Sequence, residues 1–129
     1  MSDTQLTELQ LALLRVLWAR GEATVADMVE ALRPERELAP TTVATLLSRL
    51  EKRRVVSHTS RARQYVYRAR VSEGAVRASM VNGLTESLFG GDVAALMSHL
   101  LDVRAISPGD LTRVRELIAR AEAAQEKDK

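Results

Sequence analysis

The chain has 129 residues, of which 46% are hydrophobic and 28% are charged, and its formal net charge is +2. This length fits one domain, or one small domain with an accessory element. The sequence contains no cysteine, which excludes disulfides, thiolate metal sites and cysteine nucleophiles and fits a reducing cytoplasm. No apolar run reaches the roughly 18 residues of a membrane span, and no signal-peptide pattern is present. We therefore expect a cytoplasmic protein without membrane insertion.

The positive charge is concentrated in the middle of the chain. Residues 33–70 hold ten basic and three acidic side chains, whereas residues 1–32 hold two and five, and residues 71–129 hold seven and nine. A basic segment between two acidic ones favours a surface that faces phosphate groups, so nucleic acid is the first partner to consider. A solvated, basic helix end is the alternative explanation of the charge alone.

The first predicted helix follows Thr7. Thr7 and Gln10 have the spacing of a capping box before an apolar run of helical period. Gly21 is typical of the position that follows a helix C-terminus. Trp18, the only tryptophan, falls in the last turn and is expected to anchor the core.

A second, shorter helix is predicted from Val25 to Leu32. Thr24 stands where a capping residue is expected, and Pro34 disfavours helix at the residue before it. The apolar members of this helix are expected to pack inward. Residues 35–39 form a polar connection to the next element.

The third predicted helix, residues 40–54, combines an apolar face with a face of small polar side chains. Pro40 suits the first turn of a helix, where its missing N–H would be unpaired in any case. The apolar residues share one narrow arc of the helical wheel. They are Val43, Leu46, Leu47 and Leu50.

The polar face of this helix has the chemistry of a DNA-reading surface. Small side chains let a helix approach base edges in a major groove about 12 Å wide, and hydroxyls and cations bond to bases and phosphates. We interpret the helix as one that reads double-stranded DNA; a merely solvated face is the alternative. The residues assigned to DNA binding here are Pro40, Thr41, Thr42, Ala44, Thr45, Ser48, Arg49 and Lys52.

Two short strands, Val55–Thr59 and Gln64–Arg68, are predicted from their β-branched and aromatic residues. Residues 60–63 form the predicted turn, with Arg61 and Arg63 at its tip, where they would reach the DNA backbone or the minor groove. An exposed tip whose charges serve only solubility is the alternative. Three helices followed by a hairpin predict a mostly α fold, a winged helix-turn-helix.

Three amphipathic helices are predicted after the hairpin. Ser72 begins the first, Gly90-Gly91 interrupt the pattern, Asp92 begins the second, and Ser107-Pro108 begin the third. Three apolar stripes in such a short segment favour a two-fold dimer in which they interdigitate. The alternative is that they fold back on the winged domain. The residues assigned to dimerisation are Val76, Met80, Leu84, Leu88, Val93, Leu96, Met97, Leu100, Leu111, Val114 and Ile118.

The predicted domain organisation has three parts. Residues 1–71 form a winged-helix DNA-binding domain, residues 72–124 a helical dimerisation region, and residues 125–129 a polar tail.

The sequence resembles the BlaI/MecI/CopY family of penicillinase-type repressors from Leu6 to about Ala121. The resemblance is carried by LTELQLALLRVLW near the start, APTTVATLLSRLEKRRVV over the third helix, YVYRARVSEG after the wing, and SLFGGDVAALMSHLLD in the tail. It implies a homodimeric repressor that binds a dyad-symmetric operator of resistance or stress genes. It also implies an N-terminal winged helix and a C-terminal helical dimerisation region.

In the β-lactam-responsive branch of this family, a membrane-bound sensor with a zinc protease domain triggers cleavage of the repressor. Alignment of the tail places that bond near His99-Leu100. The copper-responsive branch uses a cysteine-rich tail, which is absent here. Ala44 stands where some relatives carry a basic residue, and Arg54 stands where many have a glycine. An arginine in place of this glycine predicts that Arg54 has a left-handed backbone or that the helix ends differently.

No pattern in the sequence indicates an enzyme, a metal site or another cofactor. His58 and His99 fall in different predicted elements without ligand spacing, and Gly90-Gly91 is not followed by a phosphate-loop pattern. The alternative function is a MarR-like winged-helix regulator that releases DNA when a small molecule fills a pocket between its domains. A winged helix used only for protein–protein contact is a third possibility, against which the basic surface argues.

Overall fold

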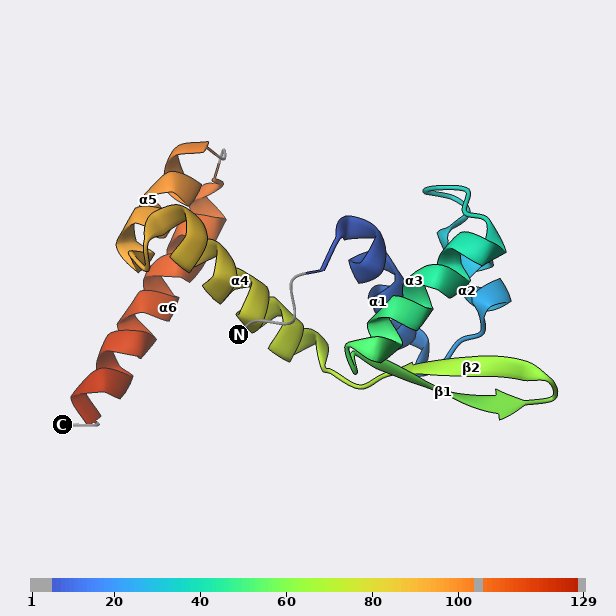
Figure 1. Ribbon diagram of the computed structural model, residues 1–129. Coiled ribbons are helices and arrows are strands. Elements are labelled where there is room, and N and C mark those ends of the chain that lie inside the picture. Colours follow the sequence, from blue (N-terminus) through green and yellow to red (C-terminus); the bar gives the residue numbers. More distant parts are fainter. Residues whose placement is uncertain (1–5, 104–105, 128–129) are drawn as a thin grey trace. The chain divides into compact units, whose positions relative to one another are not determined.

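The computed structural model describes residues 6–103 and 106–127 (Figure 1). Three helices and a hairpin come first in the chain, and three more helices follow. This order confirms the predicted mostly α, winged helix-turn-helix fold. The elements are α1 (Glu8–Arg20), α2 (Val25–Leu32), α3 (Pro40–Lys52), β1 (Val56–Arg61), β2 (Gln64–Ala69), α4 (Glu73–Phe89), α5 (Val93–Val103) and α6 (Pro108–Lys127).

The chain divides into two compact units, Met1–Leu84 and Thr85–Lys129. The first unit holds the winged helix and most of α4, and the second holds the end of α4 with α5 and α6. The predicted boundary after residue 71 separates a DNA-binding segment from a dimerisation segment. This functional division stays a prediction.

The ends of α1 form as the sequence predicts. Thr7 Oγ1 accepts a hydrogen bond from the Gln10 N–H at 3.1 Å, and the Thr7 N–H donates to Gln10 Oε1 at 3.0 Å. Gly21 has a φ of 86° and donates its N–H to the Leu17 carbonyl. Trp18 is half-buried against the core, and its Nε1 donates to the Val71 carbonyl at 2.9 Å, which ties α1 to the segment before α4.

A second capping box begins α2. Thr24 Oγ1 accepts from the Asp27 N–H at 3.1 Å, and the Thr24 N–H donates to Asp27 Oδ2 at 3.0 Å. Hydrogen bonding from the Thr24 backbone lowers the pKa of Asp27 below its ordinary value. The helix ends at Leu32, as predicted, with Arg33 as its C-cap directly before Pro34.

The core lies between the first three helices and the hairpin. The apolar face of α3 is confirmed, because Val43, Leu47 and Leu50 are fully buried and Leu46 is partly buried against the same cluster. The opposite face of α3 is therefore turned to solvent. The other main members of the core are Leu13, Leu14, Leu17, Met28, Leu32, Val55, Val56 and Tyr67.

The hairpin turn is shorter than predicted. The two strands pair antiparallel from Val56 opposite Ala69 as far as Arg61 opposite Gln64, which leaves only residues 62 and 63 in the turn. Both have positive φ, 51° and 66°, as in the type I′ turns that suit two-residue hairpins. The placement of Arg61 at the tip is therefore wrong, because Arg61 belongs to β1. The sequence did not predict a two-residue turn, because it lacks the Asn-Gly pattern that usually marks this geometry.

The hairpin is joined to the helices through Ala23. The Ala23 N–H donates to the Tyr67 carbonyl at 3.1 Å, and the Tyr67 N–H donates to the Ala23 carbonyl at 2.8 Å. This one-residue bridge attaches β2 to the connection between α1 and α2, so the base of the wing is held by backbone hydrogen bonds.

The starts of α4, α5 and α6 match the prediction. Ser72 Oγ, Asp92 Oδ1 and Ser107 Oγ each accept from the N–H three residues further on, at 3.1, 3.0 and 3.1 Å. The last helix continues to Lys127, so residues 125–127 of the predicted polar tail are helical. Residues 128 and 129 lie outside the described residues.

Most apolar side chains of α4, α5 and α6 remain exposed. The largest are between 39% and 69% exposed: Val81, Leu84, Leu88, Val93, Met97, Leu100, Leu101, Leu117 and Ile118. Met80, Leu96, Leu111 and Val114 are half-buried.

The assignment of Val76 to dimerisation is wrong. Val76 is only 1% exposed and lies beside Leu11 and Trp18 of α1. Its own unit covers it, so it is not available to a second chain.

Among the described helices, none is both long and apolar enough to span a membrane.

Asp27→Asn is expected to lower the stability of the protein near neutral pH and to remove a pH dependence. The pKa of Asp27 lies below its ordinary value of 3.8 in the folded state, so the ionised carboxylate stabilises the fold above pH 3.8. That stabilisation is lost as the pH falls through the lowered value. Urea unfolding should therefore show a smaller difference between wild type and variant at about pH 3 than at about pH 7.

Glu35→Gln is the matched control, since it removes an exposed charge without removing a cap. Equal destabilisation by Asp27→Asn at both pH values would contradict the capping role.

Candidate nucleic-acid interface

The predicted DNA-reading face of α3 is on the surface of the protein. Its eight residues are all exposed, while the opposite side of the helix is fully buried. The buried side prevents rotation of the helix, so the same face is always presented. These exposed residues are Pro40, Thr41, Thr42, Ala44, Thr45, Ser48, Arg49 and Lys52.

The hydroxyl of Thr45 has a defined hydrogen-bonding role. Its Oγ1 donates to the Thr41 carbonyl one turn earlier, at 2.9 Å. The hydroxyl proton is therefore directed back to the helix, and the lone pairs of the oxygen remain free to accept. Base edges in the major groove offer the amino groups that such an acceptor can bind.

The C-terminus of α3 is closed by a Schellman motif with an arginine in the left-handed position. The Arg54 N–H donates to the Glu51 carbonyl at 2.9 Å, and the Val55 N–H donates to the Leu50 carbonyl at 3.0 Å. Arg54 has a φ of 64°, so the left-handed backbone, one of the two alternatives expected there, is present. The helix itself ends at Lys52, two residues before the predicted end.

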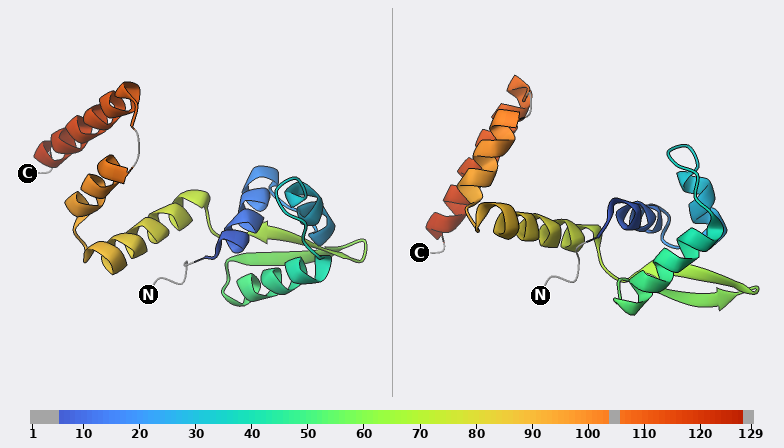
Figure 2. Two further views of the ribbon diagram at one scale, coloured as in Figure 1. Left: turned by 90° about the horizontal axis from the view of Figure 1, so that it is seen from above. Right: turned by 45° about the horizontal axis from the view of Figure 1, so that its top comes forward.

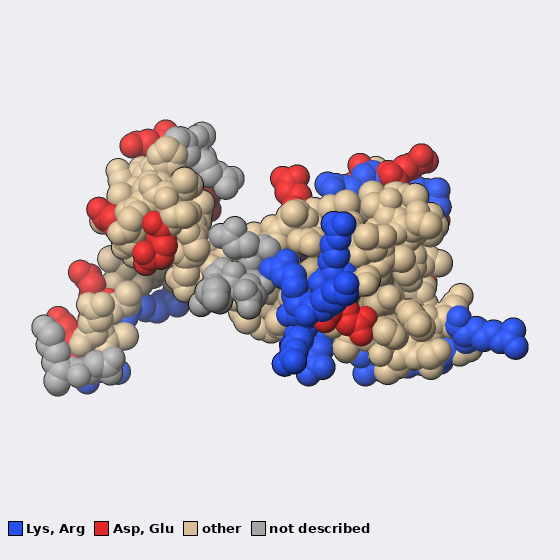
Figure 3. Space-filling model, viewed as in Figure 1, with Lys and Arg blue, Asp and Glu red and all other residues tan. Residues whose placement is uncertain are grey.

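Basic side chains gather at this end of α3. Figure 3 shows the Lys and Arg side chains clustered there, with acidic groups among them. The Arg70 N–H donates to the Val55 carbonyl at 2.8 Å, which places exposed Arg70 beside exposed Arg54. Neither arginine was assigned to DNA binding from the sequence. The run of basic residues that ends at Arg54 is the sequence feature that could have indicated a DNA-binding role for this arginine.

Arg61 is engaged in an ion-pair cluster. Its guanidinium donates to Glu22 at 2.6 Å, and Arg68 of β2 donates to the same carboxylate at 2.7 Å. The hydrogen bond from Arg61, followed by that from Arg68, lowers the pKa of Glu22, and the bond to Glu22 raises the pKa of Arg61. Arg61 would have to exchange this partner to bind a phosphate. Glu22 was not identified from the sequence, because it lies 39 residues from Arg61.

Arg63 lies in the turn at the tip of the hairpin. It is exposed, and within the described part of the chain no ion pair involves it. Together with Gln64 and Tyr65 it borders an open groove whose other side includes Pro40 at the start of α3. The views in Figure 2 agree that α3 runs along the hairpin with its N-terminal end toward the tip. The tip thus places a cation near the first turn of α3.

The wing also contacts the last turns of α3. His58 Nδ1 lies 2.6 Å from Glu51 Oε1, and the His58 ring stacks on Tyr65 with the ring centroids 4.1 Å apart. Burial, followed by the charge of Glu51, raises the pKa of Tyr67. This cluster couples helix and wing. Residues 6–103 and 106–127 contain no group of three His, Asp or Glu side chains arranged to hold a metal ion.

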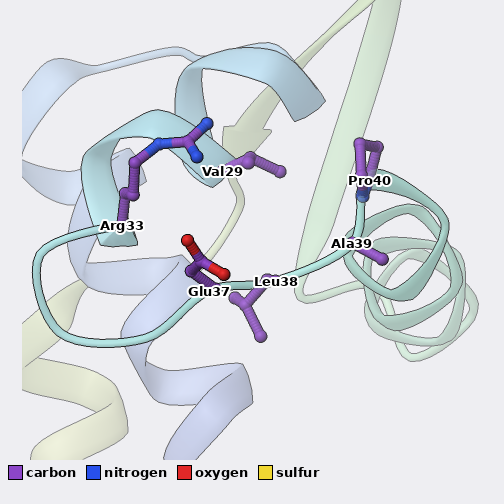
Figure 4. A pocket seen from close by; sticks show the side chains of 6 residues that line it. All are labelled: Val29, Arg33, Glu37, Leu38, Ala39 and Pro40. Carbon is purple, nitrogen blue, oxygen red and sulfur yellow. The ribbon is translucent and has the colours of Figure 1, made fainter.

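A separate hollow of about 410 Å³ lies between α2 and the connection to α3 (Figure 4). Val29 and Leu38 supply apolar walls, and Arg33 and Glu37 supply charges of opposite sign. Arg33 is already paired with Glu30 at 3.0 Å. The hollow therefore shows no excess of one charge for an anionic or cationic ligand.

Comparisons with known proteins show the family of the chain. The family model described as penicillinase repressor matches residues 6–120. Transcriptional regulator BlaI of Mycobacterium tuberculosis strain H37Rv is 32% identical over 122 residues, which cover 93% of this chain and 87% of that protein. The penicillinase repressor of Staphylococcus aureus is 17% identical over 105 residues, which cover 81% of this chain and 83% of that protein.

Two solved structures share the fold. YusO from Bacillus subtilis superimposes with a TM-score of 0.57 and 17% identity, covering 94% of this chain and 77% of that one. BpsR from Bordetella bronchiseptica, whose DNA binding is regulated by 6-hydroxynicotinic acid, gives a TM-score of 0.50 and 20% identity, covering 95% and 83%.

Arg63→Gln is expected to weaken binding to any double-stranded DNA, and Arg61→Gln is expected to weaken it less. Arg63 takes part in none of the ion pairs of the described residues, whereas Arg61 is already bound to Glu22, which it shares with Arg68. Fluorescence anisotropy over a salt series should show a slope of log affinity against log salt that is shallower by about one for each phosphate that is no longer neutralised. The two substitutions remove the same charge, so each is the control for the other. A larger decrease in affinity with Arg61→Gln would contradict this assignment.

Proposed function

The chain belongs to the penicillinase repressor family, and we propose on that basis that it is a homodimeric transcriptional repressor that binds a dyad-symmetric operator. The observation that carries this proposal is the exposed, hydroxylated face of α3, held in place by the buried Val43, Leu47 and Leu50. A face of that composition suits close approach to base edges in the major groove.

In the proposed complex, each protomer places α3 in a major groove. Thr41, Thr42 and Thr45 face base edges and nearby phosphates, because they project from the exposed side of the first two turns. Four cations of each protomer neutralise backbone charge: Arg49, Lys52, Arg63 and, after it exchanges Glu22 for a phosphate, Arg61. With about eight such phosphate interactions in a dimer, log affinity should fall with log salt at a slope of roughly −7.

The proposed dimer uses the helices that follow the wing. They carry a series of large apolar side chains that are 39–69% exposed in the single chain, which favours an interface with a second chain. A two-fold arrangement would bury these side chains and place two α3 helices on half-sites about one helical turn apart, or a multiple of it. The linked second half-site then binds at a raised effective concentration.

Derepression by proteolysis follows from the same arrangement. The proposed bond, His99-Leu100, lies within α5, and both side chains are exposed. A cut there would detach α6 from the rest of the chain and weaken the dimer. The proposed agent is a membrane-bound sensor protease, and cleavage requires local unwinding of α5 because the bond is in a helix. An intact chain in induced cells would contradict this step.

The second candidate function is release by a small molecule, as in MarR-like regulators. The fold that this chain shares with BpsR supports considering it. The two mechanisms differ in one observable. A ligand releases DNA from an intact chain, whereas proteolysis releases it only after the tail is cut.

The dimeric operator complex can be tested with Leu88→Asp. Leu88 is 69% exposed in the single chain, so its replacement removes no core packing and acts on the proposed interface alone. We expect gel shifts on the DNA upstream of the gene to lose the selective complex, and light scattering to show monomers. Ser87→Asp, which adds the same charge at the neighbouring exposed position, is the control. Selective binding and dimers that survive Leu88→Asp would contradict this interface.

Thr42→Ala is expected to reduce the preference for the operator over random DNA. In the proposed complex the hydroxyl of Thr42 contacts base edges, and a single hydrogen bond contributes about 0.5–1.5 kcal/mol. Competition binding with operator and random duplexes measures the ratio directly. Thr59→Ala, an exposed threonine on β1, is the control. An equal decrease in affinity for both duplexes with Thr42→Ala would rule out base reading by this residue.

A further inference from the structure

Arg54 has a backbone conformation that side-chain-bearing residues rarely adopt. Its φ of 64° is imposed by the Schellman motif that ends α3, a position at which glycine is the usual residue. Two other residues with a Cβ have positive φ, Ala62 and Arg63, and the two-residue turn requires it of both. At Arg54 a glycine would make the same hydrogen bonds without the steric cost.

The charge of Arg54 is available to a partner. The side chain is exposed, as is that of neighbouring Arg70, and the ion pairs among the described residues involve neither of them. Arg61 and Arg68, on the same hairpin, share Glu22. Two arginines of the wing therefore share one carboxylate, whereas Arg54 and Arg70, at the end of α3, take part in none of the ion pairs of the described residues.

These two arginines lie at the opposite end of α3 from the wing tip. Arg54 follows the last turn, and Arg70 is held beside it by its backbone bond to Val55. Arg63, at the tip, borders the same groove as Pro40 in the first turn. A helix that occupies a major groove has a sugar–phosphate backbone on each side of it, so cations at both of its ends can reach both backbones.

We propose that Arg54 and Arg70 form a second phosphate-binding surface, which grips the DNA backbone across the groove from the wing. The partner is the phosphodiester backbone of double-stranded DNA, bound without regard to sequence. The unfavourable backbone of Arg54 is tolerated because it places this cation at the end of the reading helix. This inference rests on the proposed function, since it requires α3 to lie in the groove.

Arg54→Gly separates the two effects, because it should change stability and DNA affinity in opposite directions. Removal of the Cβ relieves the left-handed strain, so the melting temperature should rise. Removal of the charge should weaken binding to operator and random duplexes by the same factor, roughly tenfold for a dimer, with a salt slope shallower by about one per protomer. Arg70→Gln should reduce the slope equally without raising the melting temperature.

Two control variants test the expected effects on melting temperature and on DNA binding separately. Arg54→Lys keeps both the charge and the strain, so it should keep the salt slope and the melting temperature. Ala62→Gly relieves a left-handed residue without changing charge, so it should raise the melting temperature and leave the slope unchanged.

An unchanged salt slope in both Arg54→Gly and Arg70→Gln would overturn the inference, and so would a weakening confined to the operator. If Arg54→Gly fails to fold, the salt slope of Arg70→Gln alone decides whether these arginines bind phosphate. The proposed function fails separately, if the wild-type chain shows no preference for its upstream DNA. In that case a shallower slope on random DNA would still support the phosphate contacts.

Discussion

The burial of one side of α3 is the constraint on which the rest of the structure depends. Val43, Leu47 and Leu50 are completely enclosed, and each such side chain contributes about 1.5–3 kcal/mol through removal from water. A small rotation of the helix would expose all three at once. The threonine face is therefore presented to solvent with a fixed orientation, and the position of the hairpin follows, because the Schellman motif leads directly from Leu50 into Val55 and β1.

Some charged side chains of the winged unit pair with one another, so its net charge does not show which cations can bind DNA. Glu22 forms ion pairs with two arginines of the wing, so these two cations already have a partner within the protein. The cations outside the ion pairs of the described residues include Arg63 at the hairpin tip and Arg54 and Arg70 at the end of α3. A surface of this kind holds DNA at separated points along the helix, and the segment between those points is left to the small hydroxylated side chains that contact the bases.

Features set by neighbouring residues were predictable from the sequence, and features set by distant residues were not. The capping box of Thr7 and the ends of α2 depend on a few consecutive positions, and both are confirmed. The left-handed backbone at Arg54 was one of two alternatives that the resemblance to the family left open, and the structure shows that it forms. The pairing of Glu22 with the wing joins residues far apart in the chain. Periodicity correctly placed Val76 on an apolar stripe, but it could not show that α1 covers this residue.

The hydrogen bond from Trp18 to Val71 gives the molecule a built-in optical probe. The chain has a single tryptophan, so its tryptophan emission arises from one site, where α1 meets the segment that leads into α4. The indole is half-buried, and its N–H is bound to a carbonyl rather than to water. Any event that separates α1 from the start of α4 would hydrate this ring and shift its emission to longer wavelength. The attachment of α4 to the winged helix can thus be followed in solution without an added label.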